Sequence, residues 1–252
     1  MDYRVISLDQ TSSTNLYLRE ALSQGAIADD CRLLFVRTDY QMSGRGCGTN
    51  RWESQPHKNL LYSVFFRPLN LAADQQFILS MANAVALSGV LSSLTDGISI
   101  KWPNDIYHRN NKLCGTLIEN SLSQGQVKWT IIGNGINVNQ DTFPDTLPNP
   151  TSLSLVTSRE HDLDNLFHSL IEATVSVLEQ VDKRQWDDLR TTYRSLLFGK
   201  GETRLFRTPD HQEQPMTIVD VSDSGRLLLN KTGEDGKACT VSYAFKEIEY
   251  II

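Results

Sequence analysis

Lys101-Trp102-Pro103-Asn104-Asp105 is the stretch that decides how the middle of this chain folds. Ser99-Ile100 before it suits the end of a strand, and Pro103 forces Trp102 out of α-helical geometry, so the chain turns sharply here. Lys112 opens the next β-like run. A strand, a tight turn and a second strand would bring an amide, a carboxylate and an ammonium together, which makes a candidate anion site. An ordinary turn with a solvated lysine is the alternative.

A second candidate site is the glycine-rich run from Gln41 to Trp52, QMSGRGCGTNRW, which follows a predicted strand over 33–36. Its glycines let backbone N–H groups approach an anion closely, and the planar guanidinium of Arg45 fits a carboxylate or a phosphate. The run is not a P-loop, because it lacks Gly-Lys-[Ser/Thr] and leads into another strand over 59–66. Taken alone, it could equally be a solvated surface turn.

Further motifs follow these two in a fixed order along the chain. They are Ser13-Thr14-Asn15, Lys112-Leu113-x-Gly115, Gly133-x-Gly135-Ile136-Asn137-Val138-Asn139 and Thr151-Ser152-Leu153. Together with Gly44-Arg45-Gly46, Trp52 and the stretch 101–105, they resemble the biotin protein ligase family over almost the whole chain. The combination is far more specific than any single motif.

The resemblance implies an ATP-dependent biotin protein ligase. Such an enzyme activates biotin to biotinyl-5′-AMP and then transfers it to a specific lysine of a biotin carboxyl carrier protein domain of a biotin-dependent carboxylase. Because the first step joins two anions, it needs charge neutralisation and alignment by Arg45, Lys112 and Mg²⁺ rather than a protein nucleophile. The alternatives are a lipoate or octanoate protein ligase or transferase of the same superfamily, and a non-catalytic biotin-binding sensor.

Site residues are assigned from the matching motif positions. Arg45 and Lys112 are predicted to be catalytic, and Asp105 is predicted to bind Mg²⁺, directly or through water. The contacts implied for biotin come from Ser13, Thr14, Asn15, Gln41, Gly44, Arg45, Trp52, Lys112, Gly115 and Gly133. Those implied for the nucleotide come from Arg45, Asn50, Trp52, Asn104, Lys112, Ile136 and Asn137. For the Gly, Trp and Asn residues, a turn, core or surface role is the alternative, and for Arg45 and Lys112 it is a solvated charge.

The glycine-rich run departs from the family pattern, in which an Arg follows Gly-Arg-Gly and another often stands three positions later. Here those places hold Cys47 and Asn50, and Arg51 is displaced by one. The missing charge predicts weaker retention of the adenylate unless another cation substitutes. Alternatively, the loop is rebuilt around Gly48, Asn50 and Arg51 and holds the adenylate equally well.

Composition narrows the class of protein. A chain of 252 residues with 40% hydrophobic residues can bury a sizeable core. The formal net charge of −6 argues against DNA binding, which relies on clustered Lys and Arg. No apolar run approaches the length of a membrane helix, so a cytoplasmic enzyme without a membrane partner is expected. The four cysteines lack the spacing of a zinc site or a disulfide framework.

In the resembling family, some members carry an N-terminal DNA-binding domain. Ser13-Thr14-Asn15 lies almost at the start of this chain, so the ligase-only form is expected here. A homodimer is a possible assembly.

The hydrophobic patterns predict an α/β (α+β) chain. A mixed, largely antiparallel central sheet flanked by helices, as in class II synthetases, is expected in a catalytic domain over 1–197, and a small SH3-like β-barrel over 198–252. The helices are predicted from the capping cluster 12–15 to Gly25 and over 74–94, 163–181 and 186–197. The strands are predicted over 4–8, 33–36, 59–66, 98–101, 112–120, 126–139, 203–207, 216–221, 226–229, 238–242 and 247–251.

Overall fold

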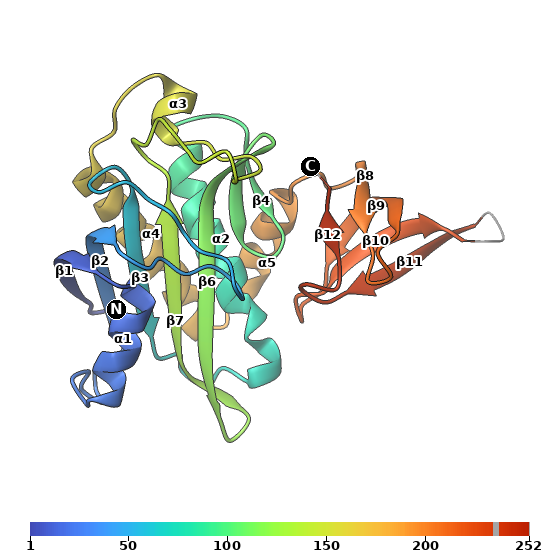
Figure 1. Ribbon diagram of the computed structural model, residues 1–252. Coiled ribbons are helices and arrows are strands. Elements are labelled where there is room, and N and C mark those ends of the chain that lie inside the picture. Colours follow the sequence, from blue (N-terminus) through green and yellow to red (C-terminus); the bar gives the residue numbers. More distant parts are fainter. Residues whose placement is uncertain (234–236, 252) are drawn as a thin grey trace.

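The computed structural model describes residues 1–233 and 237–251 and contains two β-sheets (Figure 1). The larger sheet has seven strands in the order β1-β2-β3-β7-β6-β5-β4. Only β1 and β2 run parallel, and every other neighbouring pair in this sheet is antiparallel. In spatial order, the strands are β1 (Arg4–Thr11), β2 (Leu33–Gln41), β3 (Leu60–Phe66), β7 (Gln126–Ile136), β6 (Asn111–Ser123), β5 (Asp105–His108) and β4 (Ile98–Lys101).

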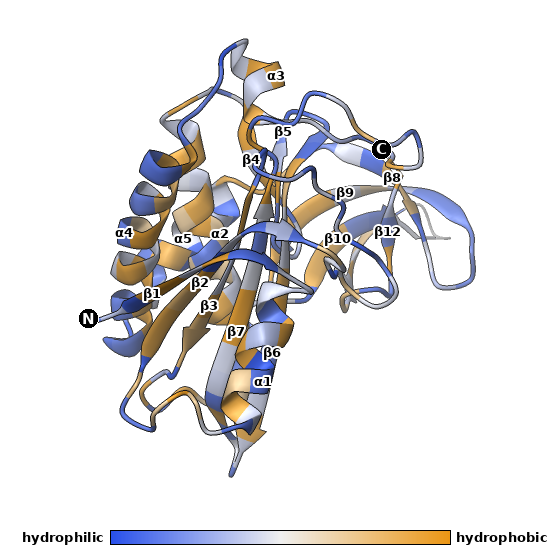
Figure 2. Cartoon of the chain, turned by 60° about the vertical axis from the view of Figure 1, so that its left-hand side comes forward, coloured by the Kyte–Doolittle hydropathy of each residue, from blue (hydrophilic) through white to orange (hydrophobic). Residues whose placement is uncertain are grey.

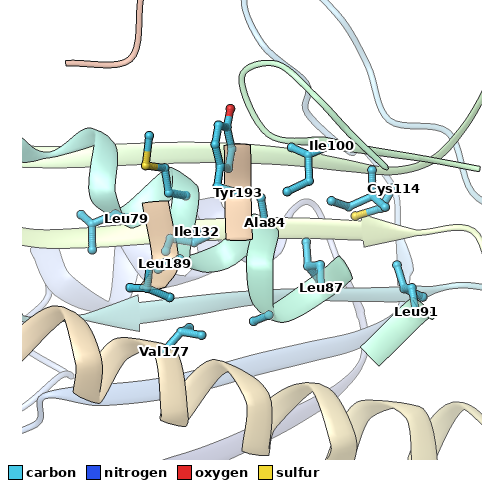
Figure 3. Close-up of a cluster of buried hydrophobic side chains, with 14 of the residues drawn as sticks. Leu79, Ala84, Leu87, Leu91, Ile100, Cys114, Ile132, Val177, Leu189 and Tyr193 are labelled. Carbon is cyan, nitrogen blue, oxygen red and sulfur yellow. The ribbon is translucent and has the colours of Figure 1, made fainter. Parts of the chain in front are cut away.

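One face of this sheet is covered by three helices, α2 (Phe77–Ser92), α4 (Leu163–Asp182) and α5 (Trp186–Ser195). Strand β3 is buried throughout, and Tyr62 and Val64 on this face belong to the main core. Figure 3 shows Leu79 and Leu87 of α2 packed in the same core. Full burial of each such side chain contributes about 1.5–3 kcal/mol.

The opposite face is only partly covered. Helix α1 (Thr14–Ser23) packs there, and its Leu18 contacts a small cluster that includes Phe65 and Ile131. Figure 2 shows that α2, α4 and α5 lie on the other side of the sheet from α1. Beyond α1, the segment between β2 and β3 crosses the front of the sheet (Figure 1). This half-open face is therefore where a ligand can approach the strands.

The smaller sheet has the strand order β11-β10-β9-β8-β12, with antiparallel neighbours. Its strands are β8 (Thr203–Arg207), β9 (Glu213–Val221), β10 (Leu227–Thr232), β11 (Ala238–Tyr243) and β12 (Glu249–Tyr250). It meets the larger sheet at the turn after β4. There Trp102 Nε1 donates to the carbonyl of Gly225 at 2.9 Å. The Lys101 ammonium lies 5.2 and 5.1 Å from the ring centroids of Tyr107 and Tyr250, and burial lowers the pKa of this lysine.

The expected fold class is confirmed, and several element boundaries differ from the prediction; the larger local differences concern β5, the start of α2, α3 and the end of β7. Strand β5 was not predicted as a separate strand, because only Ile106 and Tyr107 of its four residues are apolar. The helix expected over 74–94 is a 3-10 turn, η1 (Ala73–Gln75), followed by α2. The short helix α3 (Leu153–Thr157) was not foreseen, because five residues carry no helical periodicity. The strand expected over 126–139 ends at Ile136.

The cysteines are free thiols, as expected. No helix in the described part of the chain is both long and apolar enough to cross a membrane. The boundary at residue 198 stays a prediction, and residues 234–236 and 252 of the unit expected over 198–252 lie outside the described residues.

Candidate active site

Glycines on β6 and β7 form a floor on the half-open face of the large sheet. Gly115 and Gly135 are register partners on the two strands, and Gly133 lies two residues before Gly135 on the same face. A Cβ on Gly135 would lie 2.4 Å from Trp52 Cε2, and one on Gly115 would lie 2.7 Å from Trp52 Cζ3. A Cβ on Gly133 would lie 2.3 Å from Asn15 Oδ1. Only glycine allows these two side chains to rest on the strands.

The roof over this floor is a small hairpin that spans residues 44–52. Trp52 N donates to Gly44 O at 3.0 Å, Gly46 N donates to Asn50 O at 2.8 Å, and Arg45 forms an antiparallel bridge with Arg51. A Cβ on Gly44 would lie 2.3 Å from Trp52 O, so the close pairing at the base of the hairpin requires glycine. The glycine-rich run is thus a turn that places the indole of Trp52 on the floor.

Trp52 itself carries an unsatisfied polar atom. Its Nε1 is buried and has no hydrogen-bond partner among the described residues, and an unpaired buried donor costs about 1–3 kcal/mol. A ligand can reach Gly115 and Gly135 only after the indole moves. A ligand that contacted these glycines would therefore have to displace the indole, and the unpaired donor lowers the free-energy cost of that displacement.

One end of the floor is cationic. Lys112 Nζ on β6 donates to Asp105 Oδ2 at 2.6 Å, and Asp105 Oδ1 accepts from Thr116 N at 3.4 Å. Lys112 Nζ also lies 5.9 Å from the centroid of the Trp52 ring. Burial by itself lowers the pKa of Lys112, but the charge of Asp105 and its hydrogen bond outweigh burial, so the pKa is raised. Lys112 is therefore a fixed positive charge at this end.

The other end of the floor is neutral and polar. Gln41 Oε1 accepts from Thr14 N at 2.9 Å and from Thr14 Oγ1 at 3.2 Å. Ser63 Oγ lies 2.6 Å from both Thr14 Oγ1 and Asn15 Oδ1. Thr14, Asn15 and Ser63 are all buried. Such a pocket suits a ligand group with neutral donors and acceptors.

The cluster 12–15 was expected to cap α1, and the N-cap residue is Ser13, as that prediction has it. The side chain of Ser13, however, makes no capping hydrogen bond in the described part of the chain. The side chains of Thr14 and Asn15 instead face β2, β3 and β6. The polar cluster at this helix start serves the floor rather than the helix.

The predicted nucleotide residues are less closely gathered. Arg45 is exposed on the hairpin, and Asn104 lies in the turn between β4 and β5. Asn137 is buried and donates to the carbonyl of Thr151 at 2.9 Å, so its amide ties two loops together. The side chain of Ile136 packs in the main core, on the helix-covered face. These assignments stay predictions.

The ammonium of Lys246, which lies between β11 and β12 in the chain, approaches the tip of the hairpin. A Cβ on Gly48 would lie 2.7 Å from Lys246 Nζ. Gly48 has φ of +70°, which favours glycine there. A positive charge thus lies beside Cys47, where the expected arginine is missing.

Three residues of this site, Ser63, Glu119 and Arg19, were missed in the sequence, and Gly135 was recognised in a motif but given no role. Ser63 could have been found from its place in an otherwise apolar strand with one tyrosine. Glu119 and Arg19 gave no local signal, because they lie 104 and 100 residues from their respective partners, Asn15 and Glu119.

The suggested Mg²⁺ site can be tested on its donors. Both oxygens of Asp105 already accept hydrogen bonds, from Lys112 and from Thr116. Within residues 1–233 and 237–251, no group of three or more His, Cys, Asp or Glu side chains could hold a metal ion. The side chains present therefore do not form a complete Mg²⁺ site, and Asp105 as a metal ligand stays a prediction.

Comparison with known proteins identifies the family. Residues 7–137, just over half of the chain, match the Biotin/lipoate A/B protein ligase family. The chain belongs to this family.

Among individual members of this family, the chain is 29% identical to the bifunctional ligase/repressor BirA of Bacillus spizizenii over 233 residues, covering 91% of this chain and 70% of the relative. It is 28% identical to the biotin–[acetyl-CoA-carboxylase] ligase of Mycobacterium tuberculosis, covering 89% and 82% of the two chains. It spans 40% of the Escherichia coli BirA protein, at 33% identity. The biotin protein ligase of Aquifex aeolicus, solved with biotin and ATP, shares the fold with a TM-score of 0.78 and 23% identity over 98% of both chains.

Proposed function

We propose that the chain is an ATP-dependent biotin protein ligase that forms biotinyl-5′-AMP and transfers biotin to a lysine of a carrier domain. The observation that carries this proposal is the glycine floor, with a neutral polar pocket at the Gly133 end and a cation at the Gly115 end. Biotin has the same polarity, since a neutral ureido ring lies at one end and a carboxylate at the other. Relatives named as biotin ligases support this assignment.

In the first step, an oxygen of the biotin carboxylate attacks the α-phosphorus of ATP. The new C–O–P linkage forms as the bond to the β-phosphate breaks, and pyrophosphate leaves. Lys112 can neutralise charge where the two anions meet, and Asp105 holds its ammonium in place at 2.6 Å. Such a preorganised cation stabilises charge that develops in the transition state. Arg45, exposed on the hairpin, can approach the same anions as the roof closes over them.

In the second step, the amine of the carrier lysine attacks the acyl carbon of the adenylate. A C–N bond forms, the C–O bond to AMP breaks, AMP leaves with the electron pair, and the amine loses a proton. The acceptor is proposed to be a biotin carboxyl carrier protein domain of a biotin-dependent carboxylase. The predicted cytoplasmic location, the homodimer and the absence of DNA binding stay expectations.

Mg²⁺ is expected to accompany ATP, but no step above depends on a metal ligand from the chain. Lys112 and Arg45 carry the positive charge that the described residues themselves supply to the first step.

The family also contains lipoate ligases, which is the alternative for the same chemistry. The buried polar pocket favours biotin, because the apolar end of lipoate or octanoate would offer no hydrogen bonds to Thr14 and Asn15. A site built from buried polar groups discriminates strongly against a ligand that leaves them unpaired. A non-catalytic sensor would have no need for the Lys112–Asp105 pair.

Release of pyrophosphate should be measured with ATP and biotin, lipoate or octanoate supplied separately. The proposal predicts turnover with biotin only, and transfer of biotin to a purified carrier domain when that domain is added. Turnover with lipoate or octanoate would assign the other branch of the family. Biotin binding without pyrophosphate release in any of the three reactions would indicate a sensor.

A further inference from the structure

Glu119 on β6 links the exposed helix surface to the polar end of the glycine floor. Its Oε1 accepts from Arg19 at 3.2 Å, and its Oε2 accepts from Asn15 Nδ2 at 2.9 Å. Asn15 Nδ2 also faces the carbonyl of Leu117 at 3.4 Å. The amide nitrogen of Asn15 therefore faces two groups that can only accept hydrogen bonds.

This arrangement fixes the direction of the Asn15 amide. An asparagine amide donates from nitrogen and accepts at oxygen, and turning it over would place Oδ1 against the ionised carboxylate of Glu119. With Nδ2 held by Glu119, Oδ1 must lie over Gly133, where a Cβ would meet it at 2.3 Å. The pocket consequently presents an acceptor, not a donor, at this point.

The acceptor keeps capacity for a ligand. Asn15 Oδ1 has two lone pairs, and within residues 1–233 and 237–251 its one donor is Ser63 Oγ at 2.6 Å. The single proton of Ser63 is shared between Asn15 and Thr14, since both oxygens lie at 2.6 Å. A ligand N–H that arrives over Gly133 would thus meet an oriented, incompletely satisfied oxygen.

We propose that Glu119, held by Arg19, is a positioning residue that sets the polarity of the pocket for an N–H-bearing ligand head. This inference rests on the proposed function, because the N–H groups are those of the biotin ureido ring. Glu119 acts through Asn15 and contacts neither ATP nor the reacting carboxylate. It is a determinant of which ligand head is accepted, separate from the cation that serves the chemistry.

The test compares Glu119→Ala with the conservative variant Glu119→Gln in the full chain. Glu119→Ala frees the amide to turn, so the KM for biotin should rise about tenfold, the value of roughly one hydrogen bond. The kcat and the KM for ATP should change less than about twofold. Glu119→Gln still offers an acceptor oxygen to Asn15 Nδ2, so it should stay within about threefold of wild type in all three constants. Glu20→Ala, which removes an exposed acid next to Arg19 on α1, is the matched control.

An unchanged KM for biotin in Glu119→Ala would overturn the inference. So would equal losses in both KM values and in kcat, because a merely structural defect predicts them. If Glu119→Ala fails to fold, Glu119→Lys is tested in its place, after urea unfolding has shown that this variant is folded. An unchanged KM for biotin in Glu119→Lys would also overturn the inference. Wild-type protein assayed alongside separates the two ideas: absence of biotin-dependent pyrophosphate release there would reject the proposed function itself, whereas normal wild-type turnover with an unaffected Glu119→Ala would reject only the positioning role.

Discussion

Replacing Lys112 by methionine tests the chemistry while keeping the packing. The Lys112 stem contacts the floor, since a Cβ on Gly115 would lie 3.2 Å from its Cε, and methionine can fill a similar volume. The substitution removes the charge and the hydrogen bond to Asp105, while most of the apolar stem is kept. Loss of one preorganised charge-stabilising group costs about 3–4 kcal/mol in the transition state, so adenylate formation should slow by about 10²–10³.

In the same substitution, the donor that remains to Asp105 among the described residues is Thr116 N, at a long distance of 3.4 Å. A half-buried carboxylate that loses its cation should destabilise the fold by about 1–3 kcal/mol. Adding Asp105→Asn to Lys112→Met should therefore recover most of the stability but none of the rate. This divergence separates a catalytic charge from a structural pair.

The measurements are single-turnover pyrophosphate release and urea unfolding for wild type, Lys112→Met and the double variant. A rate for Lys112→Met within about tenfold of wild type would refute the catalytic assignment, because a lost cation at the reacting anions cannot cost so little. Recovery of the rate in the double variant would refute it as well, since the rate would then follow stability.

Four further outcomes are expected. In wild type, Asp105 raises the pKa of Lys112 above 10.5, whereas in Asp105→Asn burial lowers this pKa without that opposing charge. Because the ammonium loses its charge above its pKa, pyrophosphate release by the variant should decline at a lower pH than in wild type. Identical pH–rate profiles for the two proteins would contradict this expectation. Gly135→Ala should weaken biotin binding about tenfold or more in calorimetry, because its Cβ occupies floor space that a ligand needs once the indole has moved, whereas Gly89→Ala, with nothing within 4 Å, should not. Cys47→Arg should lower bystander biotinylation up to about fivefold when no carrier is added, and equal labelling would show that the loop already retains the adenylate. A gel-shift assay at physiological salt should detect no binding to duplex DNA, because the net charge is −6, and sequence-dependent binding would overturn this expectation.

Local patterns were enough to predict most of the fold. The apolar run over 59–66 and the alternation after Gln126 predicted β3 and β7, because burial on one or both faces leaves a direct mark on sequence. The pair Asp105–Lys112 was expected from its turn, since a hairpin joins residues a few positions apart. Strand β5 left too short and too polar a mark to be separated from that turn.

The remaining parts of the site depend on contacts that sequence spacing does not encode. Glu119 meets Asn15 across 104 residues, and a single acid on a strand looks the same whether it faces water or an amide. The indole of Trp52 fits on β6 and β7 because Gly115 and Gly135 carry no side chains. This position can be inferred only once the pairing of the two strands places these glycines side by side. Long-range packing, rather than local propensity, sets these features.

The glycine floor also limits how this protein could be re-engineered or could diverge. Room for a bulkier ligand is usually made by shortening a side chain, but Gly115, Gly133 and Gly135 have none to shorten, and any replacement makes the space shallower. Ligand size can then be accommodated only from above, through Trp52 and its hairpin. Substitutions that widen the range of ligands should consequently also change how quickly the roof opens and closes. Substrate specificity and the rate of product release would then evolve together.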